Sequence, residues 1–228
     1  MRLRLLIAAG ATGHALPALA PVVPVVGAAL AIPMRLDTAP GVALTFDDGP
    51  HPQGTPATLE VLRGAGVPAT FFLAGEQVER DPALAAEIVA AGHEVGLHCH
   101  RHRNQLRLAP WQIADDMRRG EAAIVDAGVP APRLYRPPYG IFSGAGLLLA
   151  RRRYQLLLWT RWGRDWSAGS TPASIAAKAT ERTDPGDVIL LHDADHYSDP
   201  GSWRNTTEAL PRILETLSSR DQRPIAVP

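Results

Sequence analysis

Two adjacent carboxylates end a short apolar run of the chain. Asp47 and Asp48 directly follow Val42-Ala43-Leu44-Thr45-Phe46 and precede Gly49-Pro50. A strand that stops in this way projects both carboxylates at its end, where like charges resist ionising together unless a cation or a donor compensates them. The pair therefore indicates a reaction centre that other residues of the chain must share.

Two histidines can supply ligands for such a cation. His98 and His102 are four residues apart, the spacing that places two imidazoles on the same side of a helical turn. With Asp48 as third ligand they form a His-His-Asp set typical of divalent metal sites, which leaves a coordination position open for water. We expect the metal to acidify that water.

Four further residues fit the proton transfers of a metal-assisted hydrolysis. Asp47 is the candidate general base, and Arg136 would keep its carboxylate ionised and oriented. His192 is the candidate acid that protonates the leaving group, and Asp165 is the natural partner of its other ring nitrogen.

Each motif also has a purely structural interpretation. The stretch with His98 and His102 also contains His93 and His100, so it could be a basic surface turn. Asp-Asp-Gly can be a plain turn, Arg-Pro-Pro-Tyr-Gly a polyproline-like loop, Asp-Trp a packing pair, and His192 a core histidine. Their joint occurrence in this order favours the metal hydrolase.

The elements that must position these residues alternate along the chain. Apolar runs predict strands at about 42–46, 69–73, 94–97, 133–136, 154–160, 187–191 and 224–227. Helical stretches lie near 55–65, 77–91, 110–127, 143–152, 172–183 and 203–219. Asp81-Pro82 and Thr171-Pro172 have the residue types of helix starts, and Gly92, Gly128 and Gly186 those of stops or turns.

This alternation is typical of parallel strands joined by crossover helices. The seven strands predict an irregular α/β barrel or an open doubly wound sheet. Each candidate residue follows a predicted strand, and the carboxyl ends of parallel strands share one face, which holds the active site in such folds. We therefore expect the candidates to converge.

Length, charge and cysteine count set only broad limits on fold and function. The 228 residues suit one sizeable domain, and 23 Lys plus Arg against 23 Asp plus Glu give no net field that would indicate a nucleic-acid partner. The single cysteine, Cys99, cannot form an intramolecular disulfide.

The N-terminus predicts export. Arg2 and Arg4 precede a stretch without formal charge from Leu5 to Pro33, which resembles a signal or membrane-anchoring segment. Its glycines and prolines argue against one straight helix, and Pro21 disfavours cleavage after Ala18-Leu19-Ala20. We expect a hydrophobic segment at 1–36, a catalytic domain at 37–228 and an extracytoplasmic, membrane-anchored or secreted protein; an arm packed on the domain is the alternative.

Five motifs resemble, in order, those of the NodB-homology polysaccharide deacetylases, the fourth family of carbohydrate esterases. They are Thr45-Phe46-Asp47-Asp48-Gly49, Gly96 through His98 to His102, Arg136-Pro137-Pro138-Tyr139, Asp165-Trp166 and Leu190-Leu191-His192, within a match from about 41 to 225. The resemblance implies a distorted (β/α)7 barrel that removes acetyl groups from N-acetylated sugars of a polysaccharide or peptidoglycan. It also implies one divalent metal, usually zinc and sometimes cobalt or another ion.

The roles that the family pattern implies agree with those inferred above from residue type and spacing for Asp47, Asp48, His98, His102, Arg136, Asp165 and His192. It adds substrate contacts at Pro137, Tyr139, Trp166 and Leu190: the Tyr139 backbone amide would help to hold the oxyanion, and Trp166 and Leu190 would line the pocket for the acetyl methyl group.

The chain departs from the pattern locally. Cys99 replaces the usual Ser or Thr and is expected to be a small buried side chain rather than a soft ligand. His100 should point away from the metal, and Trp162 stands where an additional Asp often occurs. The segment 193–205 could be a lid or a sugar-stacking wall.

Three functions are compatible with these residues. The main hypothesis is N-deacetylation of a glycan. The same residues could hydrolyse an O-acetyl ester or an N-formyl group on a glycan or a lipid-linked sugar, because one methyl group is worth only about 1–3 kcal/mol of discrimination. A glycan-binding module without turnover is the alternative from another class.

Overall fold

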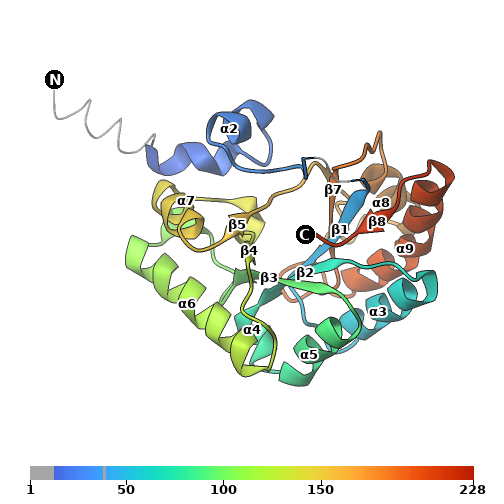
Figure 1. The fold of residues 1–228 in the computed structure, drawn as a ribbon, viewed down its shortest axis with the longest axis horizontal. Coiled ribbons are helices and arrows are strands. Elements are labelled where there is room, and N and C mark those ends of the chain that lie inside the picture. Colours follow the sequence, from blue (N-terminus) through green and yellow to red (C-terminus); the bar gives the residue numbers. More distant parts are fainter. Residues whose placement is uncertain (1–12, 38–39) are drawn as a thin grey trace.

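The centre of the molecule is one curled sheet of parallel strands (Figure 1). The computed structural model describes residues 13–37 and 40–228. Within them, eight strands form a sheet in the order β5-β4-β3-β2-β1-β7-β6, and β8 pairs with β1. The strands are β1 (Val42–Asp47), β2 (Thr70–Ala74), β3 (Glu94–Cys99), β4 (Leu134–Tyr135), β5 (Gln155–Leu156), β6 (Arg161–Trp162), β7 (Val188–His192) and β8 (Pro224–Ile225).

Helices surround this sheet, and Figure 1 shows α6, α4, α5, α3 and α9 in an arc outside the strands. They are α3 (Gly54–Ala65), α4 (Gly75–Val78), α5 (Pro82–Ala90), α6 (Pro110–Asp126), α7 (Gly144–Arg151), α8 (Pro172–Ala179) and α9 (Ser202–Ser219). Both predicted helix starts are confirmed: Asp81 accepts the Leu84 N–H, and Thr171 accepts that of Ser174. The predicted helix 77–91 is two helices, because Asp81 caps α5 and Pro82 cannot continue α4.

The prediction of one strand at 154–160 is wrong. Its first residues form β5 beside β4, β6 follows at the far edge beside β7, and residues 157–160 cross the gap between them. Part of the crossing segment is held by a side chain: the Arg136 guanidinium donates to the carbonyl oxygens of Leu157 at 3.0 Å and Leu158 at 2.9 Å. The fold is therefore the expected distorted barrel, with eight strands in place of seven and an opening between β5 and β6.

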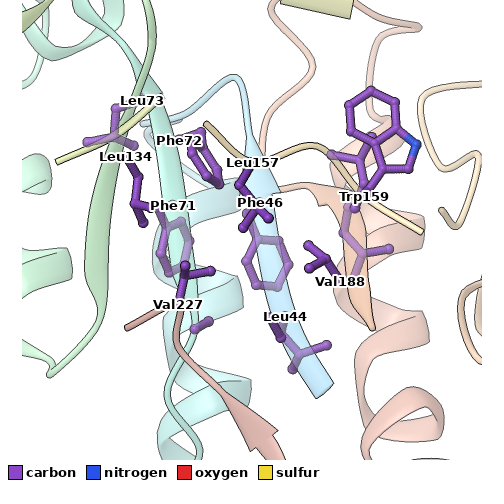
Figure 2. Close-up of a cluster of buried hydrophobic side chains, with 14 of the residues drawn as sticks. Leu44, Phe46, Phe71, Phe72, Leu73, Leu134, Leu157, Trp159, Val188 and Val227 are labelled. Carbon is purple, nitrogen blue, oxygen red and sulfur yellow. The ribbon is translucent and has the colours of Figure 1, made fainter. Parts of the chain in front are cut away.

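The core lies around β1. All six residues of β1 are buried, as expected for the centre of a parallel sheet covered on both faces. Figure 2 shows Phe46 of β1 beside Phe71 of β2, with ring centroids 5.0 Å apart, and Leu44, Val188 and Val227 around them. Each such side chain stabilises the fold by about 1.5–3 kcal/mol, so the strand that ends in the two carboxylates is rigidly placed.

Residues 13–37 form an arm that packs on the domain. It contains η1 (Leu16–Leu19) and α2 (Pro24–Ala29), and its Ala20 and Ile32 are buried in the core. Leu158 donates its N–H to Pro33 at 2.8 Å, and Leu36 donates to Gly186 at 2.8 Å. No helix within residues 13–37 or 40–228 is long and apolar enough to cross a membrane. Arg2, Arg4 and the start of the uncharged run lie outside the described residues, so the signal or anchor and the boundary at 36 stay predictions.

Candidate active site

The two carboxylates at the end of β1 have different backbone conformations. Asp47 is the last residue of the strand, whereas Asp48 has φ +77°, a left-handed conformation that is uncommon for a residue other than glycine. Both side chains are buried, and they meet different partners. Strain of this kind is characteristic of functional sites.

Asp48 faces two imidazole nitrogens. Its Oδ1 lies 3.3 Å from His98 Nε2 and 3.4 Å from His102 Nε2. His98 Nδ1 lies 2.8 Å from the Arg136 carbonyl oxygen. Because a carbonyl can only accept, the His98 proton sits on Nδ1, and its Nε2 presents a lone pair to Asp48.

These residues fit a divalent metal. Asp48 Oδ1 is buried and has no hydrogen-bond partner within residues 13–37 and 40–228, which is costly for a carboxylate unless a cation is near. Two ligand atoms bonded at about 2.0–2.1 Å to one tetrahedral zinc ion are about 3.3 Å apart, and the two separations from Asp48 Oδ1 have that size. One carboxylate and two imidazoles are also a donor set that zinc accepts.

The protonation states suit metal ligands. Burial alone would raise the pKa of Asp48, but contact with His98 and the charges of His192 and His102 hold it below its usual range. Burial lowers the pKa of His102 to about 4, against the opposing effect of Asp48. At neutral pH the carboxylate is therefore ionised and the His102 imidazole is neutral.

The prediction that His98 and His102 share a helical turn is wrong. His98 lies in β3 and His102 in the loop after it, yet their ring centroids are 5.2 Å apart. The chain folds back because Asp116 of α6 accepts the backbone N–H groups of His100 at 2.8 Å and Arg101 at 3.2 Å. These bonds end the strand and turn His102 toward Asp48.

Asp47 forms a buried ion pair. Its Oδ1 accepts from Arg136 Nη1 at 2.7 Å, and the same nitrogen donates to Thr45 Oγ1 at 2.8 Å. Arg136 is fully buried, and burial lowers its pKa while Asp47 opposes that effect. The other Asp47 oxygen, Oδ2, lies 3.9 Å from His98 Nδ1, so Asp47 is adjacent to the ligand set without joining it.

His192 stands beside Asp47 on the neighbouring strand, where the register of β1 and β7 pairs the two residues. Its Nδ1 lies 3.0 Å from Asp165 Oδ1, and Asp165 Oδ2 accepts from the His192 backbone N–H and from Thr206. Although burial opposes protonation, Asp165 raises the pKa of His192 to about 10, with smaller contributions from Asp48 and Asp47. The imidazolium is thus held by a fixed carboxylate.

A cavity of about 310 Å³ joins these groups. Of the expected substrate contacts, Tyr139, Trp166 and Leu190 line it, whereas Pro137 does not: Pro137 is buried and its carbonyl accepts the Gly140 N–H. The remaining lining residues are Asp47, Asp48, His98, His102, Gly140, Trp159, Trp162, His192, Tyr197 and Ser198. No motif in the sequence points to Trp159, and Tyr197 was visible only as part of the 193–205 segment.

Comparison with known proteins identifies the family. Residues 36–153 match the family model described as polysaccharide deacetylase. The chain belongs to the polysaccharide deacetylases. The match to carbohydrate esterase family 4 and its NodB homology region, expected from the five motifs, is confirmed.

Individual family members share most of the chain. A peptidoglycan-N-acetylglucosamine deacetylase of Bacillus cereus is 35% identical over 82% of this chain and 85% of its own length. A chitooligosaccharide deacetylase of Bradyrhizobium is 38% identical over 75% and 77%. The solved structure of a family 4 carbohydrate esterase from Streptomyces lividans, in complex with acetate, superposes with a TM-score of 0.73, 32% identity, and coverage of 82% and 93%.

The departures of this deacetylase from the family pattern have local explanations. Cys99 is buried and free, and it is not among the clustered ligand atoms of Asp48, His98 and His102. His100 points elsewhere, as expected, with its Nε2 at 3.0 Å from Glu79. Asp193, next to His192, has no role predicted from the sequence; it is buried, accepts from Thr55, and has its pKa raised to about 7 by burial.

His51, Asp195 and His196 form a second group of potential ligands. His51 Nδ1 accepts the backbone N–H groups of Gln53 and Gly54, so its proton is on Nε2, which faces Asp195 at 3.1 Å. His196 Nε2 lies 3.1 Å from the Pro50 carbonyl oxygen and donates to it. With these nitrogens engaged, the group connects the loop after β7 to the turn after β1.

Proposed function

We propose that this polysaccharide deacetylase is a metal-dependent amidase that removes acetyl groups from N-acetylated sugars of a glycan. The observation that supports it best is that Asp47, Asp48, His98, His102 and His192 line one cavity, while the buried Arg136 and Asp165 pair with Asp47 and His192. A divalent ion held by Asp48, His98 and His102, with zinc the first candidate, would supply a Lewis acid that polarises the acetamide carbonyl and acidifies a water.

The protein's own groups then move the protons. The Asp47 carboxylate accepts a proton from the attacking water, and the ion pair with Arg136 fixes the position of that carboxylate. The His192 imidazolium donates its Nε2 proton to the departing amine while Asp165 holds the Nδ1 side. The C–N bond breaks, and acetate and a free amino sugar result.

The cavity walls would orient the acyl group. The backbone amide of Tyr139 is proposed to stabilise the developing oxyanion, and Tyr139 has φ +60° in the turn η3 (Pro138–Gly140) that places it at the cavity. Trp166 and Leu190 provide apolar surface for the methyl group, and the Trp166 ring also meets His192 edge-on at 5.7 Å.

We also propose the class of glycan substrate and the cellular location. The names of the two curated relatives give peptidoglycan N-acetylglucosamine and chitooligosaccharide as their substrates. We infer a glycan of this class and an extracytoplasmic enzyme that is secreted or anchored through the uncharged run Leu5–Pro33. Cell fractionation and sequencing of the mature N-terminus would test the location.

The activity test is acetate release from chitooligosaccharide and from peptidoglycan fragments, with O-acetylated xylan and an N-formylated sugar as parallel substrates. We expect activity on an N-acetylated glycan, loss with a chelator and recovery with Zn²⁺ or Co²⁺. Preferential formate or ester cleavage would favour the alternative acyl groups. Absence of stoichiometric metal together with an Asp48→Asn variant of unchanged activity would contradict the proposal.

A further inference from the structure

The two candidate imidazole ligands are held in different ways. His98 has a hydrogen bond from Nδ1 to the Arg136 carbonyl at 2.8 Å. His102 Nδ1 is buried and has no hydrogen-bond partner among the described residues. Because outer hydrogen bonds normally fix the ring orientation of a metal-binding histidine, another contact must fix that of His102.

Two tyrosines enclose the His102 ring. Tyr197, from the loop after β7, lies parallel to it, with a centroid distance of 4.4 Å and an interplanar angle of 10°. Tyr139 meets it at the same distance but nearly edge-on, at 66°. Tyr139 is 54% exposed, so Tyr197 is the better anchored of the two if its hydroxyl is held.

The Tyr197 hydroxyl is held by α4. It donates to Glu76 Oε1 at 2.7 Å and accepts from Gln77 Nε2 at 3.0 Å. The Gln77 side-chain oxygen Oε1 in turn accepts from Arg80 Nη1 at 2.9 Å, which fixes the direction of the side-chain amide. The Glu76 backbone N–H donates to the His100 carbonyl at 3.0 Å. The support of Tyr197 is thus tied to the segment that contains His102.

We propose that Tyr197 is a positioning residue that sets the ring plane of His102 by stacking, in place of the missing hydrogen bond. The stacked phenol prevents rotation of the imidazole and so keeps His102 Nε2 directed at Asp48 Oδ1. An imidazole that gives its Nε2 lone pair to a cation becomes electron-poor, which strengthens its attraction to the phenol face. The inference rests on the metal site of the proposed function and adds a residue to it.

The test compares full-length Tyr197→Phe, Tyr197→Leu and wild-type protein in Zn²⁺ binding by chelator competition. We expect Tyr197→Leu to weaken Zn²⁺ binding about 10- to 100-fold, the usual effect of losing an outer support of a ligand. Tyr197→Phe keeps the ring and should restore affinity to within about threefold of wild type. With Co²⁺ in place of Zn²⁺, Tyr197→Leu should also change the visible absorption spectrum, which reports ligand geometry.

Kinetics at saturating Zn²⁺ separate positioning from substrate contact, because Tyr197 also lines the cavity. If Tyr197 only positions His102, Tyr197→Leu should lower kcat and leave KM for the glycan within about twofold of wild type. A change of that size is what a substitution away from the substrate causes. A raised KM with unchanged Zn²⁺ affinity would overturn the inference and make Tyr197 a sugar contact. Circular dichroism of the metal-free variants checks folding. Wild-type protein that binds no Zn²⁺ would refute the metal site itself, whereas tight binding by wild type and Tyr197→Leu alike would refute only this inference.

Discussion

The adjacent carboxylates Asp47 and Asp48 at the end of β1 lie in different electrostatic environments. The Asp47 carboxylate has a permanent internal cation, because Arg136 is buried against it. Asp48 has no such partner in the part of the chain that the structure describes: its Oδ1 receives no hydrogen bond there and faces His98 Nε2 and His102 Nε2. A buried carboxylate left in this state is unfavourable without a cation, which is why we propose Asp48, and not Asp47, as the metal ligand.

The division of roles predicts different effects of two neighbouring substitutions. Asp47→Asn removes the proton acceptor but keeps the side-chain size, so we expect kcat to fall about 10³-fold with Zn²⁺ stoichiometry unchanged. Asp48→Asn should lose both activity and bound Zn²⁺. Acetate release and metal analysis of the same preparations check this, and Asp47→Asn with more than a tenth of wild-type kcat would exclude Asp47 as the base.

The His192–Asp165 pair predicts a pH dependence. His192 must be protonated to act as the acid, so activity should decline as pH rises toward its pKa of about 10. Asp165 is the main group that raises this pKa, and Asp165→Asn should therefore move the alkaline limb of the kcat profile to lower pH. An unmoved limb would show that another group titrates there.

The same shift has a consequence for stability, with a defined sign. The folded-state pKa of His192 lies above the ordinary 6.5, so the stabilisation is complete below about pH 6.5 and is lost as pH rises through about 10. Urea unfolding of the metal-free protein between pH 7 and 10 should show this decline, and Asp165→Asn should show less of it. An equal decline in both proteins would contradict the assignment.

At the scale of elements, side chains from neighbouring elements hold segments that lie outside the helices and strands. Arg136 supports residues 157–158 in the gap of the sheet, and Asp116 of α6 folds the chain after β3. Asp116 also pairs with Arg103 at 2.7 Å. The geometry of His98 and His102 therefore depends on a helix residue that is not itself in the site.

Asp116→Ala should accordingly damage both fold and metal site. It leaves the His100 and Arg101 N–H groups without their acceptor, and we expect a loss of about 2–3 kcal/mol in unfolding free energy together with weaker Zn²⁺ binding. Asp115→Ala is the matched control, because Asp115 is the preceding residue of α6 and its side chain is about half exposed. Equal effects of the two variants, measured by urea unfolding and chelator competition, would argue against the role of Asp116.

At the scale of the whole molecule, the arm of residues 13–37 covers the side where the barrel is open. It bonds to residue 158 and to Gly186, and Arg35 pairs with the buried Asp187. A second cavity, of about 910 Å³, lies between the arm and Trp159 and Trp162, both of which also line the candidate active site. Residues 13–37 are therefore packed as a component of the domain.

Two substitutions in the arm test that statement. Ile32 is 3% exposed within the core, and Ile32→Ala should cost about 2–4 kcal/mol in unfolding free energy. Val25 of α2 is 71% exposed, and Val25→Ala should change it by less than about 0.5 kcal/mol. Urea unfolding should remain a single transition in both variants; an unaffected Ile32→Ala protein would mean that the arm is not part of the cooperative unit.

The sequence by itself determined the alternation of parallel strands and helices, the helix starts at Asp81 and Thr171, and the common edge of the sheet that gathers the candidate residues. These features follow from local signals: apolar periodicity, capping residue types, and the rule that parallel strands end on one face. Only the tertiary structure decided that 154–160 divides between two edges and that His102 returns through a loop. It also decided that Tyr197 covers His102 and that the Arg136 side chain bonds to two segments, β1 and residues 157–158. Each of these depends on a partner distant in sequence, such as Asp116, Glu76 or Leu157, whose position no local pattern contains.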